Sequence, residues 1–503
     1  MIPVTKDEIL RLLPLLIPAV ASLVALLIAA FRPDDRRIAP VVAAIGSLAA
    51  ISAMAVWGWK ASSGAGPMMG GMIAMDFYAL FFTFIILAML VGSTALAVAG
   101  LRAQDYAHGE YWALMLFAAC GAILLAASTN LLLTFVGIEV MSVSIYALVG
   151  SDRNRSRPPE AALKYFLLGA FSSAFLLFGI AFVYGATGSM DLAVIREAVR
   201  VAPDAGHQAQ LRLGTALMLV GFCFKTSAAP FPMWTPDAYT GAPTTVTAFM
   251  ASAVKAASFA AFVRIFAATL GPTAGFWSDL IAVAAGLTVI VGNLGAIAQT
   301  ELKRMLAYSG IAHAGYLLIG LRAASIDPGA ATPAILYYLL AYTFTALGAF
   351  AVVVAVERWR GHELLIEDLA GLSVKHPLMA AAMAVFMLAL AGIPPTAGFT
   401  AKLYVFSTTI KIGDYALAVI GVLGSAVSLW YYLRVIVVMY MREPAPEGGD
   451  RRAGSVAPEP GAMMPSVFGV VAVSVLVVMV AGIAPDWYFR LSRVAAASSI
   501  QAI

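Results

Sequence analysis

Long apolar runs recur along the whole chain and are separated by short polar or charged stretches. A helix needs about 20 consecutive apolar residues to cross the hydrocarbon core of a bilayer, and these runs reach about that length. We therefore predict an all-α polytopic membrane protein, a single transmembrane domain over residues 1–503 with about fourteen spans. The predicted spans are residues 9–31, 38–57, 77–100, 111–128, 131–150, 161–185, 213–233, 243–270, 276–298, 304–321, 331–356, 378–409, 415–441 and 465–484.

Prolines interrupt two of these spans. Pro230 and Pro232 lie in the seventh, and Pro394 and Pro395 lie in the twelfth. Proline removes a helical hydrogen bond and clashes with the preceding turn, so both helices should be broken there. A break inside a membrane is tolerated where the freed backbone faces protein or a water-filled cavity, and transporters use such breaks near the membrane midplane.

The two broken spans are five apart. Because five is an odd number, a five-helix repeat along the chain would be inverted across the membrane. We expect helices 4–8 to form a first repeat over residues 110–270 and helices 9–13 a second over residues 276–441. A flexible linker over residues 443–464, rich in proline, glycine and charge, should precede the last helix. Beyond that helix we expect only a short tail.

Charge and composition agree with a membrane protein. Hydrophobic residues make up 62% of the chain and charged residues only 12%, against about 25% charged in soluble domains. The net charge of +4 is small, so nucleic acid is not an expected partner. Sixteen lysines and arginines fall in loops after odd-numbered spans and ten on the other side. The positive-inside rule therefore predicts that both termini lie outside the cytoplasm.

Neither cysteine suggests a metal or redox site. Cys120 and Cys223 lie in apolar runs without CxxC spacing, so we expect two small buried hydrophobes and no iron–sulfur ligands. The chain also has no GxGxxG fingerprint after a strand and no GxxxxGK[ST] loop. We expect no cofactor and no metal ion on this chain.

Five ionisable residues lie well inside predicted spans: Glu139, Lys225, Lys255, His313 and Lys402. An intramembrane charge is costly and is by default a candidate functional site. A buried lysine can load and release a proton when a neighbouring charge moves, whereas arginine stays protonated. Three deep lysines therefore favour a proton relay.

Two arginines also lie within predicted spans, and the buried charges have one competing interpretation. Arg264 and Arg434 lie toward the ends of their spans, where a long side chain can reach the membrane surface. The competing interpretation of the buried charges is a set of ion pairs that only fixes helix packing.

Five segments carry a resemblance to a known family. The chain resembles subunit N, an antiporter-like membrane subunit of bacterial NADH:quinone oxidoreductase (respiratory complex I). The matching segments are LLLTFVGIEVMSVSIYAL, EAALKYFLLGAFSSAFLLFGIAFVYGATGS, FKTSAAPFPMWTPDAYTGAPTTVTAFMASAVKAASFA, KRMLAYSGIAHAGYLLIG and GIPPTAGFTAKLYVF, within about residues 130–410. The lysine in the twelfth span also resembles subunit N, since subunit M-like chains carry glutamate there.

The resemblance implies a role for each buried ionisable residue. Glu139 matches a glutamate of span five that modulates a lysine of span seven. Lys225 matches that lysine, and we expect the two residues to pair. Lys255 matches the central lysine of span eight, His313 a histidine on the hydrated path, and Lys402 the terminal lysine of span twelve. Together they would form the proton-translocation relay.

The chain departs from the family pattern at two places. Pro230-Phe231-Pro232 replaces the usual Pro-Phe-His, so a polar member of the path is missing. Thr300-Glu301-Leu302 stands where asparagine is commoner. Both departures would also suit a paralogous complex with another electron donor.

The resemblance also implies partners and a location. The chain would be a subunit of a proton-translocating NADH:quinone oxidoreductase in the bacterial inner membrane, with both termini in the periplasm. FMN, iron–sulfur clusters and quinone would sit on partner subunits, and other membrane subunits would be its neighbours. The main alternative is a subunit of a multi-subunit Na⁺/H⁺ antiporter without redox coupling.

Overall fold

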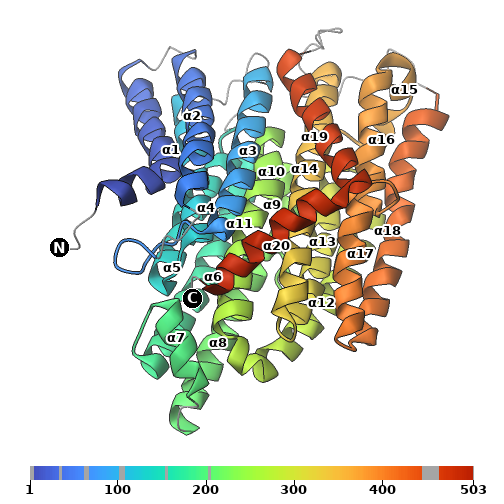
Figure 1. Cartoon of the computed structure of the whole chain (residues 1–503). Helices are drawn as coiled ribbons and strands as arrows, with labels where there is room; N and C mark the ends of the chain where they lie inside the picture. Colours follow the sequence, from blue (N-terminus) through green and yellow to red (C-terminus); the bar gives the residue numbers. More distant parts are fainter. Residues whose placement is uncertain are drawn as a thin grey trace.

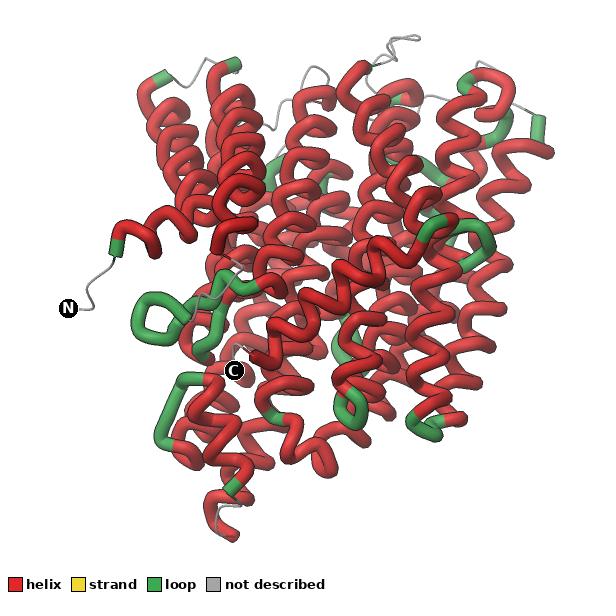
Figure 2. The backbone as a smooth tube through the Cα atoms, in the orientation of Figure 1, coloured by secondary structure: helices red, strands yellow, loops and turns green. Residues whose placement is uncertain are grey.

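The computed structural model describes residues 5–32, 37–61, 67–100, 108–152, 157–201, 205–443 and 464–501. Almost all of these residues are helical, and none of them lies in a β-strand (Figure 2). The helices are α1 (Lys6–Phe31), α2 (Ile38–Ala61), α3 (Phe77–Gly100), α4 (Gly109–Ala127), α5 (Leu131–Val149), α6 (Arg157–Thr187), α7 (Leu192–Arg200), α8 (Ala205–Thr226), α9 (Trp234–Gly241), α10 (Thr244–Phe249), η1 (Met250–Val254), α11 (Lys255–Phe262), η2 (Val263–Thr269), η3 (Gly271–Thr273), α12 (Ala274–Ile297), α13 (Leu302–Ala324), α14 (Pro328–Arg360), η4 (Ile366–Leu369), α15 (Leu372–Lys375), α16 (Pro377–Ala391), α17 (Ala397–Lys411), α18 (Tyr415–Met441), α19 (Pro465–Ile483) and α20 (Pro485–Gln501).

Most long helices stand side by side in one bundle, as predicted (Figure 1). Two apolar stretches occupy its centre, because α14 and the continuous helical stretch Thr244–Thr269 are fully buried along their most apolar windows. Peripheral helices keep exposed apolar faces, for example Leu23 on α1 and Leu423 on α18. Such faces are stable against lipid and not against water. The all-α membrane fold class is therefore confirmed.

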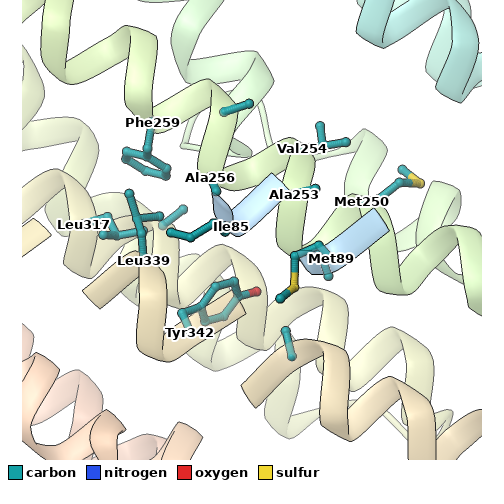
Figure 3. Close-up of a cluster of buried hydrophobic side chains, with 14 of the residues drawn as sticks. Ile85, Met89, Met250, Ala253, Val254, Ala256, Phe259, Leu317, Leu339 and Tyr342 are labelled. Carbon is teal, nitrogen blue, oxygen red and sulfur yellow. The ribbon is translucent and has the colours of Figure 1, made fainter. Parts of the chain in front are cut away.

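Close helix contacts hold the bundle together. A Cβ atom added to Gly121 of α4 would lie 2.3 Å from the backbone nitrogen of Met141 on α5, so only glycine permits this approach. Small residues play this part in membrane bundles, where packing replaces the hydrophobic drive between helices. Figure 3 shows the apolar cluster where α3, α11, α13 and α14 meet, with the hydroxyl group of Tyr342 inside it.

Eleven helices among the described residues are long and apolar enough to cross a membrane. Three further predicted spans correspond to α8, to α13, and to α16 followed by α17. These three carry Lys225, His313 and Lys402. Helices α8 and α13 contain several further polar residues, and the break leaves α16 and α17 with only 15 residues each. The count of fourteen spans stays a prediction, as do the two inverted repeats.

Both predicted breaks are present. Helix α8 ends at Thr226, and Ser227 follows with φ 63° before α9 begins at Trp234. Helix α16 ends at Ala391, and Gly392 follows with φ 82° before α17 begins at Ala397. Lys225 thus precedes its break, whereas Lys402 follows its own.

Two details differ from the sequence predictions, and a third prediction falls mostly outside the described residues. The tail after the last span forms the 17-residue helix α20, which lies obliquely across the bundle and packs against α3 and α14 (Figure 1). Arg264 does not reach the surface: its side chain is 1% exposed and pairs with Asp76 at 2.7 Å. Most of the predicted linker, residues 444–463, lies outside the described residues.

Candidate functional site

Four of the five predicted site residues are buried in the bundle. Lys225, Lys255, His313 and Lys402 are 5%, 3%, 4% and 4% exposed. They lie on α8, α11, α13 and α17, respectively, and Glu139 is half-buried on α5. A charge so far from water needs polar partners in the protein. The identity of those partners decides what the site can do.

Lys225 lies in the last turn of α8 and reaches two hydroxyl groups of α5. Its Nζ atom donates to Ser142 Oγ at 2.8 Å and to the Tyr146 hydroxyl at 3.1 Å. The Tyr146 ring centroid lies 5.5 Å from the same ammonium group, within the range of a cation–π contact. Ser142 and Tyr146 are four residues apart and therefore share one face of α5.

Glu139 lies one turn before Ser142 on α5. Its carboxylate accepts a hydrogen bond of 2.5 Å from Ser173 of α6. Within the described residues it forms no ion pair with Lys225, so the expected direct pairing is not formed. Ser142 and Tyr146 bind the ammonium group instead, and Ser173 binds the carboxylate. Glu139 therefore lies beside the lysine's partners without touching the lysine.

Lys255 lies between two short π-helical segments, η1 and η2. Its Nζ atom donates to the Gly310 carbonyl of α13 at 2.5 Å and to the Tyr342 hydroxyl of α14 at 3.5 Å. The Tyr342 ring centroid is 5.1 Å away. Widened π-helical turns are frequent at functional sites. Here they lie on either side of α11, whose first residue is Lys255.

His313 lies among tyrosines. Its Nδ1 atom is 2.7 Å from the Tyr338 hydroxyl and its Nε2 atom 3.2 Å from the Tyr432 hydroxyl. Donor and acceptor roles in these two bonds follow from the tautomer of the ring. The ring also lies against Tyr342, with centroids 4.9 Å apart. Tyr342 therefore contacts both Lys255 and His313.

Lys402 binds the end of the broken helix α16. Its Nζ atom donates to the carbonyl groups of Leu390 and Ala391, both at 2.9 Å, and to Ser425 Oγ at 2.8 Å. The last carbonyl groups of a helix lack intrahelical partners and form the negative end of its dipole, so an ammonium group is stabilised there. The end of α16, at the break before α17, thus provides the binding site for the Lys402 ammonium group.

A second tyrosine connects Lys402 to the histidine. The ammonium group of Lys402 lies 5.1 Å from the ring centroid of Tyr316, and that ring meets His313 edge-on at 5.7 Å. Lys255, Tyr342, His313, Tyr316 and Lys402 therefore form a continuous line of contacts across α11, α14, α13 and α17, which we call the buried axis.

Lys225 and Glu139 stand apart from the buried axis. In the described part of the chain, no hydrogen bond or ion pair joins either residue to Lys255. Helices α8 and α11 meet through apolar rings, because Phe222 stacks on Phe262 with centroids 5.0 Å apart. The five predicted residues thus divide into a pair and a group of three.

The sequence interpretation missed the tyrosines of the buried axis. Tyr316 lies three residues after His313 on α13. Tyr342 lies on α14 four residues after Tyr338, the partner of His313, so both tyrosines share one face of that helix. A buried tyrosine hydroxyl usually finds a hydrogen-bond partner. Tyrosines at helical spacing beside known buried charges were the signal that could have identified them.

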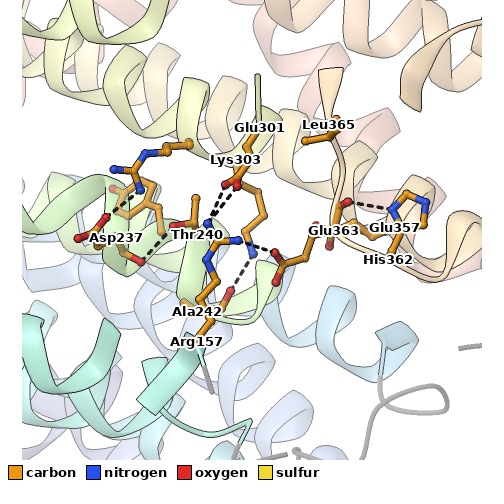
Figure 4. Close-up of polar contacts among 12 residues, drawn as sticks. Arg157, Asp237, Thr240, Ala242, Glu301, Lys303, Glu357, His362, Glu363 and Leu365 are labelled. Atoms are coloured by element: carbon orange, nitrogen blue, oxygen red, sulfur yellow. Dashed lines mark hydrogen bonds and ion pairs between the residues drawn. The ribbon is translucent and has the colours of Figure 1, made fainter. Parts of the chain in front are cut away.

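A polar network joins the helix ends near Glu301 (Figure 4). Arg157 at the start of α6 pairs with Glu301 at 3.0 Å and with Glu363 at 3.1 Å. Arg304 of α13 pairs with Asp237 of α9 at 2.7 Å. The glutamate that departs from the family pattern therefore binds an arginine of another helix.

Lys303 belongs to the same network. The sequence places it among the loop cations, but it is 6% exposed and donates to the Ala242 carbonyl at 2.8 Å (Figure 4). The contact connects the start of α13 to the turn between α9 and α10.

The other departure from the family pattern, Pro230-Phe231-Pro232, lies beside a small pocket. The pocket has a volume of about 300 Å³ and opens at the break after α8. Its lining residues are Ala229, Pro230, Pro232, Met233, Pro236, Val291 and Tyr308. Apart from Tyr308 these are apolar, so the lining offers no histidine, lysine or carboxylate in place of the missing histidine.

Comparison with known proteins gives relatives along most of the chain. A family model described as "NADH:quinone oxidoreductase/Mrp antiporter, TM" matches residues 128–428. NADH-quinone oxidoreductase subunit N from Trichlorobacter lovleyi is 43% identical over 433 residues, which cover 86% of this chain and 87% of the relative. NADH-quinone oxidoreductase subunit N 1 from Sorangium cellulosum is 47% identical over 383 residues, covering 74% and 75%.

Solved structures share the fold. A chain of respiratory complex I from Thermus thermophilus is 34% identical with a TM-score of 0.78, covering 95% of this chain and 98% of that one. A chain of the Mrp complex from Dietzia sp. is 22% identical with a TM-score of 0.82, covering 98% and 99%. The latter likeness concerns the fold alone.

Proposed function

The chain belongs to the family of subunit N of bacterial NADH:quinone oxidoreductases, and from that premise we propose that its buried axis carries protons across the membrane. It is a multi-pass membrane subunit of a proton-translocating NADH:quinone oxidoreductase and has other membrane subunits of that complex as neighbours. The relay residues would be Lys255, His313 and Lys402, with Lys225 and Glu139 as the adjoining pair.

The observation that carries the proposal is the continuity of the buried axis. Lys255 and Lys402 each contact a tyrosine, and both tyrosines contact His313. These ring contacts bring the three titratable groups close together, and lysine and imidazole groups can each bind and release a proton. The hydroxyl groups bound to Lys255 (Tyr342) and to His313 (Tyr338 and Tyr432) can each accept one hydrogen bond while donating another, so protons would pass through these hydroxyls and through water between them. A static set of ion pairs would need carboxylates, and in the described part of the chain none contacts these three residues.

Lys402 would be the most responsive member of the relay. Two carbonyl groups and a hydroxyl hold its ammonium form, while burial in the bundle opposes a charge. A lysine between opposing influences can change its protonation when a nearby charge moves. Movement of the α16–α17 break would alter the carbonyl contacts directly.

Lys225 and Glu139 would receive the signal from a neighbouring subunit. Glu139 lies one helical turn from Ser142, which binds Lys225, so a change at the Glu139 carboxylate can act on the lysine through space. Water at the break after α8 would connect Lys225 to the buried axis across the apolar contact of Phe222 with Phe262.

The remaining parts of the reaction belong to the whole complex. Electron transfer from NADH to quinone would supply the driving force, with FMN, iron–sulfur clusters and quinone on partner subunits. Both termini of this chain would lie in the periplasm, and residues 110–270 and 276–441 would form the inverted repeats. The Na⁺/H⁺ antiporter alternative has less support, because the Mrp chain is only 22% identical whereas the subunit N relatives exceed 40%.

A double-mutant cycle tests whether the members of the axis act in series. Proton pumping by the purified complex in proteoliposomes would be measured for Lys255→Ala, Lys402→Ala and their combination. A series relay predicts that the double variant is little slower than the slower single variant, since residues acting as a unit are non-additive. The exposed Lys375, changed to alanine together with Lys255→Ala, is the control. Losses at Lys255 and Lys402 that multiply in the double variant would show that the two act independently.

A further inference from the structure

A second cavity lies where α14, α17 and α20 meet. Its volume is about 430 Å³, larger than the pocket beside Pro232. The first turns of α14, the second half of α17 and the middle of α20 form its walls, so it exists only because the tail of the chain folds back as α20. Its lining residues are Gly329, Ala330, Pro333, Ala334, Tyr404, Ser407, Thr408, Lys411, Phe489 and Arg493.

Two cations of this cavity have no acidic partner. Lys411 ends α17 and Arg493 lies on α20, and neither forms an ion pair with any residue that the structure describes. Asp414 contacts Arg322 at 3.5 Å, and Asp327 accepts from the Ala330 backbone at 3.1 Å. Asp486 in the first turn of α20 is exposed and acts electrostatically on Tyr404 of the wall, but among the described residues it forms no ion pair with either cation. Two like charges at one cavity repel each other unless an anion lies between them.

Besides the hydroxyl residues Ser407 and Thr408, the rest of the cavity wall consists of small apolar and aromatic residues. The rings of Tyr404 and Phe489 lie against each other with centroids 4.2 Å apart. The Arg493 guanidinium group lies 5.0 Å from the Phe489 ring centroid, which holds that cation at the wall. A ligand of this cavity therefore needs a negative group and an apolar body.

The surroundings of the cavity are apolar and exposed. Leu403 and Ile410 on α17 are 51% and 48% exposed, and Trp487 and Leu491 on α20 are 63% and 44% exposed. Exposed apolar side chains of this size on a membrane protein face either acyl chains or a neighbouring membrane subunit. Helix α20 has charged and apolar residues and runs obliquely across the middle of the bundle (Figure 1).

We propose that this cavity binds the headgroup of an anionic phospholipid, with the phosphate between Lys411 and Arg493. The acyl chains would lie along the exposed apolar residues of α17 and α20. Basic pockets between transmembrane helices recognise lipid headgroups in this way. A bound lipid would fix α20 to α17, the helix that carries Lys402.

The test uses the intact complex and phosphatidylglycerol as the probe. Retention of phosphatidylglycerol would be measured by native mass spectrometry after graded delipidation, with phosphatidylcholine for comparison. Removing each cation should weaken retention about fivefold, so Lys411→Gln/Arg493→Gln should lose the lipid early. Lys411→Arg/Arg493→Lys keeps both charges and should retain it. Arg490→Gln/Lys375→Gln removes the same charge outside the cavity and should behave as the wild type.

Three outcomes would overturn the proposal. Equal retention by Lys411→Gln/Arg493→Gln and by the Arg490→Gln/Lys375→Gln control would mean that the two cavity cations bind no lipid. Displacement of phosphatidylglycerol by millimolar inorganic phosphate would assign the site to a free anion. Loss of a neighbouring membrane subunit from Lys411→Gln/Arg493→Gln would assign the cations to a carboxylate of that subunit. None of these readouts depends on proton pumping, so the lipid site and the buried axis can fail separately.

Discussion

The tyrosines of the buried axis set the distances between its titratable groups. Tyr342 contacts Lys255 through both its hydroxyl and its ring, and its ring lies against His313. Without the hydroxyl, Lys255 would keep only the Gly310 carbonyl as a polar partner on this side. At the scale of single residues, we therefore expect the Tyr342 hydroxyl to matter for proton transfer as much as Lys255 and His313 do.

Tyr342→Phe should slow proton pumping while the complex still assembles. The ring and its contact with His313 are kept, and only the hydroxyl that binds Lys255 is lost. We expect a rate about tenfold lower, which corresponds to about 1.4 kcal/mol in the barrier. Pumping in proteoliposomes, normalised to assembled complex, is the measurement.

Tyr337→Phe is the matched control for that variant. Tyr337 lies on the same helix and is equally buried, but its hydroxyl donates to the Ala481 carbonyl, away from the axis. Its loss should lower stability and leave the pumping rate of the assembled complex unchanged. Equal slowing by both variants would mean that the loss of any buried hydroxyl disturbs pumping. The Tyr342 hydroxyl would then have no specific role in proton transfer.

Broken helices are the elements that position the charges. Gly392 ends α16 with φ 82°, in the left-handed region that side chains with a Cβ atom rarely adopt. A Cβ atom there would also lie 2.8 Å from Cδ of Lys402. The glycine therefore lets the chain turn and leaves space for the lysine at the carbonyl end of α16.

Gly392→Ala should disturb Lys402 specifically. The left-handed conformation alone costs about 1–2 kcal/mol for alanine, and the methyl group would push the ammonium group off its carbonyl partners. Pumping and the thermal midpoint of the complex should both fall. Gly469→Ala on α19, where a Cβ atom meets nothing within 4 Å, is the control and should change neither. Unchanged pumping by Gly392→Ala would show that the fit of Lys402 to this turn is unimportant.

An ion pair at the helix ends connects α9, which follows the first break, to α13. Asp237 lies on α9, directly after the break that follows Lys225, and Arg304 lies on α13, the helix of His313. The two side chains are 34% and 29% exposed, which leaves the pair partly shielded from water. Movement at the first break would therefore pull on the helix that carries the histidine.

A double-mutant cycle on Asp237→Asn and Arg304→Gln should give a coupling energy of about 0.5–1 kcal/mol in thermal stability. The pair Arg442 and Glu367 is 55% and 47% exposed and should give a coupling near zero in the same cycle. We also expect slower pumping from Asp237→Asn. Coupling as small as that of the exposed pair would mean that α9 and α13 are not connected by this contact.

Sequence patterns predict much of the whole molecule and less of its site. Apolar runs and the two proline breaks give the fold, because length and hydropathy alone decide which segments can cross a bilayer. Burial of Lys225, Lys255, His313 and Lys402 follows from their positions in those runs. Their partners do not, since Ser142, Tyr342 and the Leu390 carbonyl reach them only through tertiary packing.

The same limit explains the details that differ from expectation. Asp76 lies just before a predicted span, and no local pattern indicates that it meets Arg264, 188 residues away. Helix α20 has too many polar residues to register as a span, yet it packs along the bundle. Glu139 and Lys225 match a family pattern of interacting residues, but the hydroxyl groups between them depend on how α5, α6 and α8 pack.

Proton pumping by Lys255→Arg tests the central claim most directly. Arginine keeps the positive charge and can still donate to the Gly310 carbonyl, but it does not release its proton near neutral pH. The measurement is the pumping rate per assembled complex in proteoliposomes, with Lys375→Arg at an exposed position as the control. The proposed relay predicts that Lys255→Arg loses most pumping while the control keeps the wild-type rate. Wild-type pumping by Lys255→Arg would contradict the relay and would leave the buried lysines as fixed charges.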